Sequence, residues 1–481
     1  MPSRRGRAAV LLAGFAMIAT PALADDLREA LVLAYNTNPT LQAARAGQRA
    51  VDETVPIAKS AGLPSLSGTA SFTELVKQST PTVASPDRVF GASASFSVPL
   101  YAGGGIRNSI RAAKTRVEAG QADLRGAETG VFSAVVAVYM DVILAEAVVK
   151  LNRSNVGVLE VNLQATRDRF EIGDLTRTDV AQSQARLSLV KGQARSAEAN
   201  LIAARERYIQ VVGKAPVDLQ APPALPGLPA SVEEAVTVAL DNNPDLIAAR
   251  QRSKAAGFDS DAAGAGRLPR ISVFSGADYT DYLGTNGGPA SAVTRQGFTS
   301  ATAGVRATIP LFQGGLPAAQ KRQAQAREGA TMEQEIAIER EVIASVRAAY
   351  ASWSASSEII ASTQSAVDAA ALSLEGVRAE NTVGNRTILE ILNAEQELLA
   401  AQVQLATAKR NAYVAGFNLL AAMGKAEARD LGLDGGTLYD PDLNYDRVRN
   451  QIWDWSTDPD PRALGTRTVD TAAQDGSVTG E

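Results

Sequence analysis

The residue types that most often carry out chemistry in proteins are nearly absent from this sequence. Its 481 residues include no histidine and no cysteine. That composition excludes imidazole acid–base catalysis, thiol chemistry, disulfides and metal sites built from these two residue types. Carboxylates remain as candidates for catalysis, and the sequence shows no convergent pair of them. We therefore predict that the protein is not an enzyme and holds no cofactor and no metal ion.

Two glycine-containing motifs could be mistaken for phosphate-binding sequences. Gly103-Gly104-Gly105 lacks the lysine and the hydroxyl residue of a phosphate-binding loop, and Gly213-Lys214 ends a predicted helix instead of opening one. The formal net charge of the chain is −5. A basic footprint for nucleic acid is absent, so we predict no nucleic-acid partner.

Residues 1–24 have the features of a secretory signal peptide. Arg4, Arg5 and Arg7 precede the apolar stretch Ala8–Ala19, and a small-x-small cleavage site follows at 22–24. The apolar stretch is too short to span a membrane. Cleavage would remove three positive charges and no negative ones, leaving a mature chain with a charge of −8. Without a cysteine, that chain cannot carry an N-terminal lipid anchor.

The sequence contains an internal repeat, and its two copies determine the predicted architecture. Leu27–Leu41 matches Val232–Leu246 at a distance of 205 positions. Val98–Gly104 matches Ile309–Gly315 at a distance of 211, and this spacing continues to the end of each copy. A register held this long predicts two copies of one structural unit. We assign the copies to residues 25–215 and 231–425, joined by a proline-rich surface linker at 216–230.

Each copy contains two short stretches in which apolar and small polar residues alternate. They cover about 65–76 and 91–100 in the first copy, and about 271–282 and 299–311 in the second. Their length and pattern are typical of strands that cross an outer membrane, although a half-buried sheet in a soluble domain alternates in the same way. No later stretch has about 18 consecutive apolar residues, so a membrane crossing would use strands. Because about eight strands are needed to close a barrel, four strands require oligomerisation, and a trimer would supply twelve.

The rest of each copy is predicted to be helical. The expected helices cover 26–60, 105–170 and 177–212 in the first copy, and 232–264, 316–381 and 388–423 in the second. Residues 105–170 contain no proline, and an apolar seam advances by steps of three and four from Val131 to Phe170. This spacing is typical of a coiled coil, and the helix would be about 100 Å long.

Both long helices are expected to end at a glycine turn. Gly173 and Gly384 suit the left-handed residue that follows a helix, and nearby Asp and Thr residues can cap the next helix. After Lys425 the sequence becomes a polar tail, 426–481, which we expect to be disordered from about Asp458.

With these motifs in view, the chain resembles the TolC-like outer-membrane factors of Gram-negative bacteria over nearly all of its mature length. The resemblance lies in the order, found in both copies, of an ALxxNPxL-type helix, an LPS or LPR entry to the first strand, a P-L-Y/F-x-G-G exit from the second, and a glycine turn. It implies a mainly α-helical trimeric tube, in which a twelve-stranded outer-membrane β-barrel continues into a long periplasmic coiled-coil barrel. Pro99 and Tyr101, with Pro310 and Phe312, would mark the barrel exit. The linker and part of the tail would be equatorial.

The resemblance also implies a function. Such proteins are passive ducts that dock with a periplasmic adaptor and an inner-membrane transporter of the ABC or RND type, and they contact outer-membrane lipid. The acidic tail and the missing lipid anchor favour type I protein secretion, with multidrug or small-molecule efflux as the alternative. A soluble periplasmic coiled-coil scaffold is the alternative from a different class, and it predicts extraction without detergent.

A periplasmic gate is implied at residues 384–393. Arg386 and Asp179 match positions that link neighbouring coiled coils in the closed state of the family. Glu390 and Asn393 match positions where acidic rings can line the constriction.

Two departures from the family pattern bear on this gate. Asn381 stands where well-studied relatives have a tyrosine, and the neutral Asn393 leaves Glu390 as the charged ring. Three carboxylates crowded around an axis repel one another and favour cations.

Overall fold

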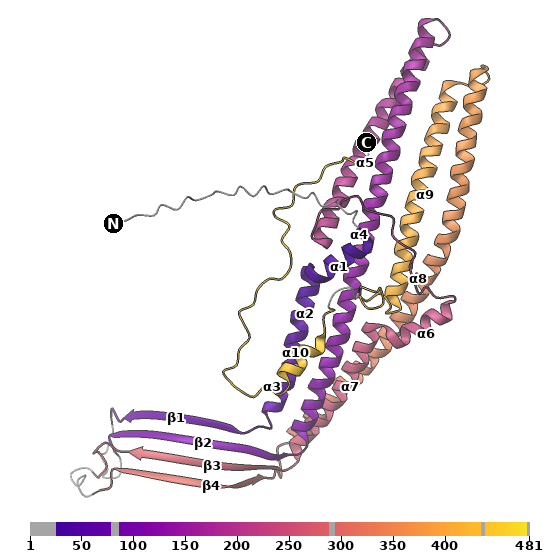
Figure 1. Cartoon of the computed structure of the whole chain (residues 1–481). Helices are drawn as coiled ribbons and strands as arrows, with labels where there is room; N and C mark the ends of the chain where they lie inside the picture. Colours follow the sequence, from indigo (N-terminus) through magenta and orange to yellow (C-terminus); the bar gives the residue numbers. More distant parts are fainter. Residues whose placement is uncertain (1–25, 78–85, 288–293, 434–437, 479–481) are drawn as a thin grey trace, which may run out of the picture.

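The molecule is a long helical rod with a sheet at one end (Figure 1). The computed structural model describes residues 26–77, 86–287, 294–433 and 438–478, so the predicted signal peptide lies outside the described residues. The first copy contains α1 (Leu27–Thr37), α2 (Pro39–Asp52), α3 (Thr54–Ser60), β1 (Ser65–Glu74), β2 (Arg88–Ala102), α4 (Gly105–Glu171) and α5 (Arg177–Val212). The second contains α6 (Val232–Asn242), α7 (Pro244–Gly264), the 3-10 helix η1 (Ala265–Arg267), β3 (Arg270–Asp281), β4 (Gly297–Thr308), α8 (Leu316–Thr382) and α9 (Ile388–Ala422). The tail adds α10 (Pro441–Val448).

The first predicted helix of each copy is divided at the repeated Asn-Pro pair, and in the first copy a second break at Glu53 separates α2 from α3. In the first copy Asn38 Oδ1 accepts hydrogen bonds from the backbone N–H groups of Thr40 (2.9 Å) and Leu41 (3.4 Å). It therefore caps α2, while Pro39 occupies the first helical position, where no N–H is needed. Asn38 Nδ2 donates to the carbonyl of Val211 in α5 at 2.8 Å.

The second copy repeats the arrangement. Asn243 Oδ1 accepts from the N–H groups of Asp245 (3.0 Å) and Leu246 (3.2 Å), and its Nδ2 donates to the carbonyl of Ala422 in α9 at 2.9 Å. A single buried side chain thus starts α7 and attaches it to the end of the returning helix.

We expect Asn243→Ala to lower the free energy of unfolding by about 1–3 kcal/mol, because it removes a helix cap and a buried hydrogen bond together. Thermal unfolding of the purified protein in detergent, followed by circular dichroism, measures the effect. Asn36→Ala is the matched control, since Asn36 is exposed and its Nδ2 bonds within α1 to Val32 O. Equal melting temperatures for the two variants would contradict the assigned role of Asn243.

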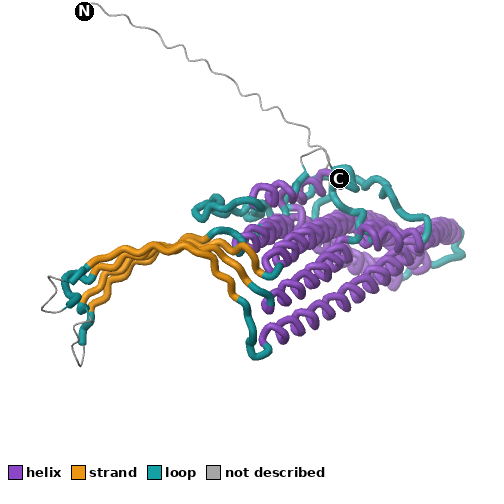
Figure 2. Tube along the Cα trace, turned by 90° about the horizontal axis from the view of Figure 1, so that it is seen from below, coloured by secondary structure: helices purple, strands orange, loops and turns teal. Residues whose placement is uncertain are grey.

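The four strands form one antiparallel sheet in the order β1-β2-β3-β4, and the pairing of β2 with β3 joins the two copies. Figure 2 shows the sheet as a curved band that extends away from the helices. Hydroxyl groups line one face: the Ser67 and Ser95 Oγ atoms lie 2.7 Å apart, and Thr69 Oγ1 lies 2.9 Å from Ser93 Oγ. Within the described residues, β1 and β4 each have one edge without a paired strand.

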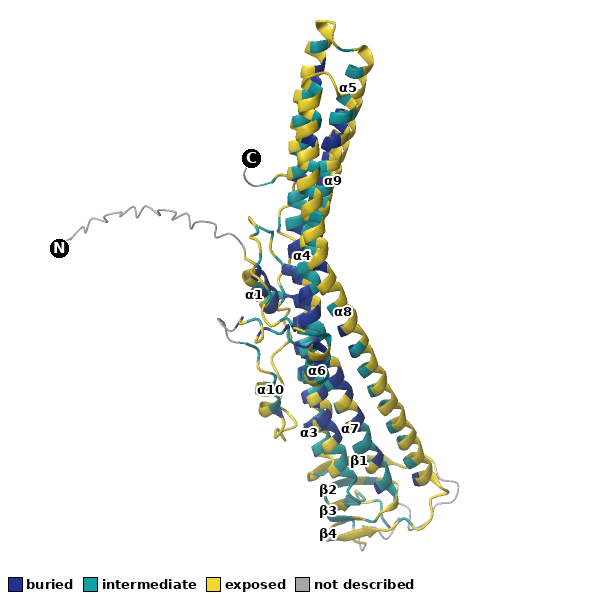
Figure 3. Cartoon of the chain, turned by 90° about the vertical axis from the view of Figure 1, so that its right-hand side faces the viewer, coloured by how far each residue is buried: buried dark blue, intermediate teal, exposed yellow. Residues whose placement is uncertain are grey.

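The two long helices differ in how far they are buried. The hydrophobic core surrounds α4, which has 21 buried residues and packs against α1, α5, α7 and α9. Its apolar middle is long enough to span a membrane by composition alone, yet Phe132, Val135 and Tyr139 there are fully buried in the core, so we interpret α4 as a core helix. The equally long α8 has only five buried residues among those described, and it is exposed over much of its length (Figure 3).

The linker is attached to both copies by a repeated tyrosine. Tyr139 donates from its hydroxyl to the carbonyl of Gln220 at 2.7 Å, and Tyr350 donates to the carbonyl of Ala230 at 3.1 Å. Both tyrosines occupy the same place in their copies, 211 positions apart. The linker therefore lies against the middle of the rod.

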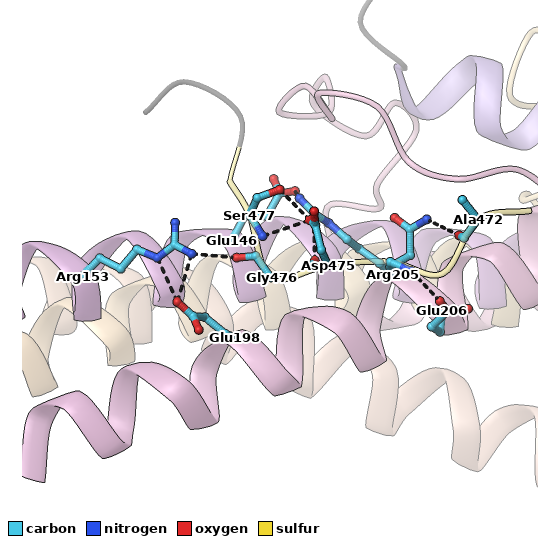
Figure 4. A network of polar contacts seen from close by, with 10 residues as sticks. Glu146, Arg153, Glu198, Arg205, Glu206, Ala472, Asp475, Gly476 and Ser477 are labelled. Atoms are coloured by element: carbon cyan, nitrogen blue, oxygen red, sulfur yellow. Dashed lines mark hydrogen bonds and ion pairs between the residues drawn. The ribbon is translucent and has the colours of Figure 1, made fainter.

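Part of the tail that we expect to be disordered contacts the helices. Thr466 N donates to the carbonyl of Thr37 in α1 at 3.3 Å, and near the end of the tail arginine side chains of α4 and α5 bind backbone carbonyls (Figure 4). Arg205 Nη1 donates to Asp475 O and Arg153 Nη2 donates to Gly476 O, both at 3.0 Å. Glu206 accepts from the N–H of Gln474, also at 3.0 Å. These partners replace the water that a polar, aperiodic segment would otherwise bind.

Candidate gate at the helix tips

Both helix hairpins turn through a glycine in the left-handed conformation at the far end of the rod. Gly173 follows α4 with φ of 85°, and Gly384 follows α8 with φ of 81°. The next N–H in each turn reaches back to a helix carbonyl: Asp174 to Arg169 at 2.9 Å, and Asn385 to Glu380 at 3.0 Å. These bonds satisfy carbonyls that a helix end leaves unpaired.

A capping box opens each returning helix. Asp179 Oδ2 accepts hydrogen bonds from Thr176 N (2.9 Å) and Thr176 Oγ1 (2.7 Å). In the second hairpin Glu390 Oε2 accepts from Thr387 N (2.8 Å) and Thr387 Oγ1 (3.0 Å). Both predicted gate carboxylates are therefore held rigidly at a helix N-terminus.

These bonds stabilise the charged form of each acid. The hydrogen bonds from Thr176 hold the pKa of Asp179 below its usual value. The backbone N–H of Thr387, with help from Arg386, lowers the pKa of Glu390 to about 2. Within one chain, Glu390 is therefore ionised at neutral pH.

Arg386 bonds to acids of its own hairpin. Its Nε donates to Glu380 at 2.6 Å and its Nη1 donates to Glu390 at 2.7 Å, which raises the pKa of its guanidinium. Asn381, at the position of the family's tyrosine, donates from Nδ2 to the Arg386 carbonyl at 2.7 Å. Within one chain Arg386 and Asp179 do not meet. Asn393 is exposed, and its side chain has no hydrogen bond within the described ranges.

One residue that joins the two hairpins near their tips is not apparent from the sequence. Glu395 of α9 has a side chain only 4% exposed, and its Oε1 accepts from Asn162 of α4 (2.7 Å) and Arg378 of α8 (3.0 Å). Its Oε2 is buried without a partner in the described part of the chain. Arg186 of α5 adds a second connection by donating to the Leu392 carbonyl at 3.3 Å. The available signal was an acid three residues after Leu392, within the buried stripe of α9.

The predicted barrel-exit residues lie at the opposite end of the rod. Pro99 lies in β2 beside a register shift between Pro99 and Tyr101. Pro310 and Phe312 follow β4, which ends at Thr308. All four residues immediately precede the start of a long helix, α4 or α8.

Comparison with known proteins identifies a family with this architecture. The model of the outer membrane efflux protein family matches residues 30–214 and 235–425. Outer membrane efflux protein BepC of Brucella suis biovar 1 is 34% identical over 457 residues, which cover 95% of this chain and 97% of BepC. Alkaline protease secretion protein AprF of Pseudomonas aeruginosa is 28% identical over 307 residues, or 62% of each chain. The crystal structure of the Campylobacter jejuni CmeC outer membrane channel aligns with a TM-score of 0.72 and 16% identity, covering 88% of this chain and 89% of CmeC.

The two matched segments coincide with the two structural copies, and together they span most of the sequence. With the structural likeness to CmeC, they confirm the resemblance to TolC-like factors and the fold that this resemblance implies. The chain therefore belongs to the outer membrane efflux protein family, whose members are outer-membrane channels with a large periplasmic part.

Proposed function

We propose that three copies of this chain form the outer-membrane exit duct of a tripartite export system, and that its cargo is a protein secreted by the type I route. A periplasmic adaptor and an inner-membrane ABC transporter would complete the system. Similarity to AprF, which is named as a protease secretion protein, supports the secretion cargo. Small-molecule efflux with an RND transporter is the second candidate, because BepC is named as an efflux protein and matches over a larger share of the chain.

The observation that most supports a duct built from several copies is that the four-stranded sheet is open at both edges within the described residues. A four-stranded sheet whose outer strands β1 and β4 each have a free edge would pair with other chains, and closure into a barrel removes such edges. Three sheets joined edge to edge give twelve strands, with the hydroxyl-lined face toward a wet lumen.

The exposed face of α8 supports the same assembly. Among its exposed apolar residues are Met332, Ile336, Ile359 and Leu372. With five buried positions among the described residues of a 67-residue helix, much of α8 is left uncovered by its own chain, and helix stability in proteins comes mainly from packing. A neighbouring copy that packs against α8 would supply the missing contacts.

A deletion strain distinguishes the two cargo classes. Under the secretion proposal, the strain loses a protein from the culture medium and keeps its resistance to detergents and dyes. Increased sensitivity with an unchanged set of secreted proteins would instead assign the duct to efflux.

The state of Glu390 predicts how ion selectivity depends on pH. Within one chain the pKa of Glu390 is about 2, so its carboxylate is charged well above that value and is neutralised only as the pH falls toward it. Repulsion among three such carboxylates in a ring raises this pKa. We expect cation selectivity in planar bilayers to persist from pH 7 to about pH 4, and Glu390→Gln to abolish it at pH 7. Reversal potentials in a KCl gradient measure both effects, with Glu375→Gln on α8 as the control. Cation selectivity that survives Glu390→Gln at pH 7 would exclude a Glu390 ring in the pore.

A further inference from the structure

A basic cleft lies where the sheet joins the helices. It has a volume of about 860 Å³ and is lined by α3, the end of β2, the start of α4 and tail residues 449–452. These elements lie together at the sheet end of the rod in Figure 1. The proposed function gives this cleft no role.

The charged side chains described in the lining of the cleft are all positive. Its lining includes Lys59, Arg107, Arg111, Lys114 and Arg449, and the described lining contains no acidic residue. This concentration occurs in a chain with a net charge of −5. Among the described residues, exposed Arg107 and Lys114 form no ion pair, whereas Arg449 contacts Asp446 beside the cleft at 3.3 Å. Cations gathered in this way create a local potential that attracts an anion.

Lys59 holds the wall of the cleft in place. Its Nζ donates to the carbonyl of Arg449 at 2.5 Å and to Asn450 Oδ1 at 2.9 Å, which fixes the tail against α3. Partial burial, together with the charges of Lys114 and Arg449, lowers the pKa of Lys59. The geometry therefore keeps like charges close to one another.

The rim of the cleft is apolar on the side of the sheet and the tail. Leu100 and Tyr101 are exposed at the end of β2, and Ile452 is exposed on the tail. The two residues Trp453 and Trp455 follow with 71% and 83% of their surface exposed. Exposed tryptophan and tyrosine are enriched where a protein crosses the membrane–water interface.

We propose that this cleft binds an anionic phospholipid from the periplasm-facing leaflet of the outer membrane, with the cations contacting its phosphate and the apolar rim contacting its acyl chains. The inference rests on the proposed function, because it requires β2 to lie in the membrane. A free phosphate would use the cations alone, whereas a lipid uses the cations and the rim together.

Native mass spectrometry of the full-length protein in detergent tests the site. The protein is titrated with dioleoyl phosphatidylglycerol, with zwitterionic dioleoyl phosphatidylcholine, and with inorganic phosphate as a competitor. The test variant is Arg107→Gln with Lys114→Gln, and the matched control is Arg322→Gln with Arg327→Gln at a similar depth on α8. We expect the test variant to weaken phosphatidylglycerol binding at least about tenfold, and the control variant to change it by less than about twofold.

Each outcome bears on a separate claim. Tighter binding of phosphatidylglycerol than of phosphatidylcholine, lost in the test variant and resistant to inorganic phosphate, supports the site. A trimer whose lipid binding is the same in both variants overturns it, as does displacement of the lipid by inorganic phosphate. The same spectra report the oligomer, so a protein that is monomeric in every sample would overturn the proposed duct itself.

Discussion

Gly424→Ala is expected to destabilise the fold by more than about 3 kcal/mol and to remove most of the assembled protein from the membrane fraction. Gly424 follows α9 with φ of 70°, a conformation that a side chain disfavours. A Cβ atom there would lie 2.4 Å from the carbonyl oxygen of Asn242 and 2.9 Å from the backbone nitrogen of Asn243. Asn243 bonds to Ala422, so this backbone cannot move away without breaking the joint between α7 and α9.

Alanine substitutions at two other glycines distinguish the cost of backbone strain from the cost of a steric clash. Gly384 has φ of 81° and open space around it, so Gly384→Ala should show only the smaller strain of about 1–2 kcal/mol. Gly213 is the counterpart of Gly424 in the first copy. A Cβ there would lie 2.6 Å from Thr466 Oγ1 and 3.7 Å from Thr37 Oγ1, and both of these atoms belong to side chains that can turn away. Melting temperatures in detergent should therefore fall most for Gly424→Ala, less for Gly213→Ala and least for Gly384→Ala. Equal losses at Gly424 and Gly384 would mean that the contact with Asn242 is not tight.

Glu395→Ala is expected to raise the single-channel conductance several-fold. The substitution removes two charge-assisted hydrogen bonds, together worth about 1–3 kcal/mol: the bond from Asn162 ties α4 to the second hairpin, and the bond from Arg378 ties α8 to α9 within that hairpin. A bias of that size shifts an equilibrium between closed and open tips by about 5- to 150-fold. Planar bilayer recordings of the purified protein give the conductance, and circular dichroism confirms that the variant is folded.

Three comparison variants sharpen this test. Glu395→Gln keeps an acceptor for Asn162 and should fall between wild type and Glu395→Ala. Glu397→Ala removes an exposed acid two residues later and should behave as wild type. Arg386→Ala breaks exposed pairs within one hairpin, so its rise in conductance should be smaller than that of Glu395→Ala. A larger rise for Arg386→Ala would show that contacts of the tip with other copies control the gate.

The parts of the fold that the sequence predicts are those specified by local chemistry. Positive-φ glycines mark the helix turns at Gly173 and Gly384, because few other residues adopt that conformation. Period-two alternation marks the strands, and the repeat itself predicts that the same unit occurs twice. The helix breaks before Pro39 and Pro244 were not predicted. Proline fits the first turn of a helix, so a proline alone does not show whether one helix has ended and another begins.

The missed features depend on partners that are remote in sequence. Glu395 meets Asn162 from 233 positions away, and the tail meets arginines more than 260 positions earlier. No periodic signal connects such residues. The predicted pair of Arg386 and Asp179 is not formed within one chain, because each residue bonds inside its own hairpin. A link between them remains a prediction about contacts between neighbouring copies.

Disulfide cross-linking of sheet edges tests most directly the claim that separate copies share one barrel wall. The chain has no cysteine, so Thr69→Cys in β1 can be combined with one cysteine at a time between Phe298 and Thr308 in β4. If three copies share one barrel wall, at least one pair, oxidised in the outer membrane, gives a covalent species with three times the chain mass on a non-reducing gel. Cross-links only within single chains, or none at any β4 position, would contradict it.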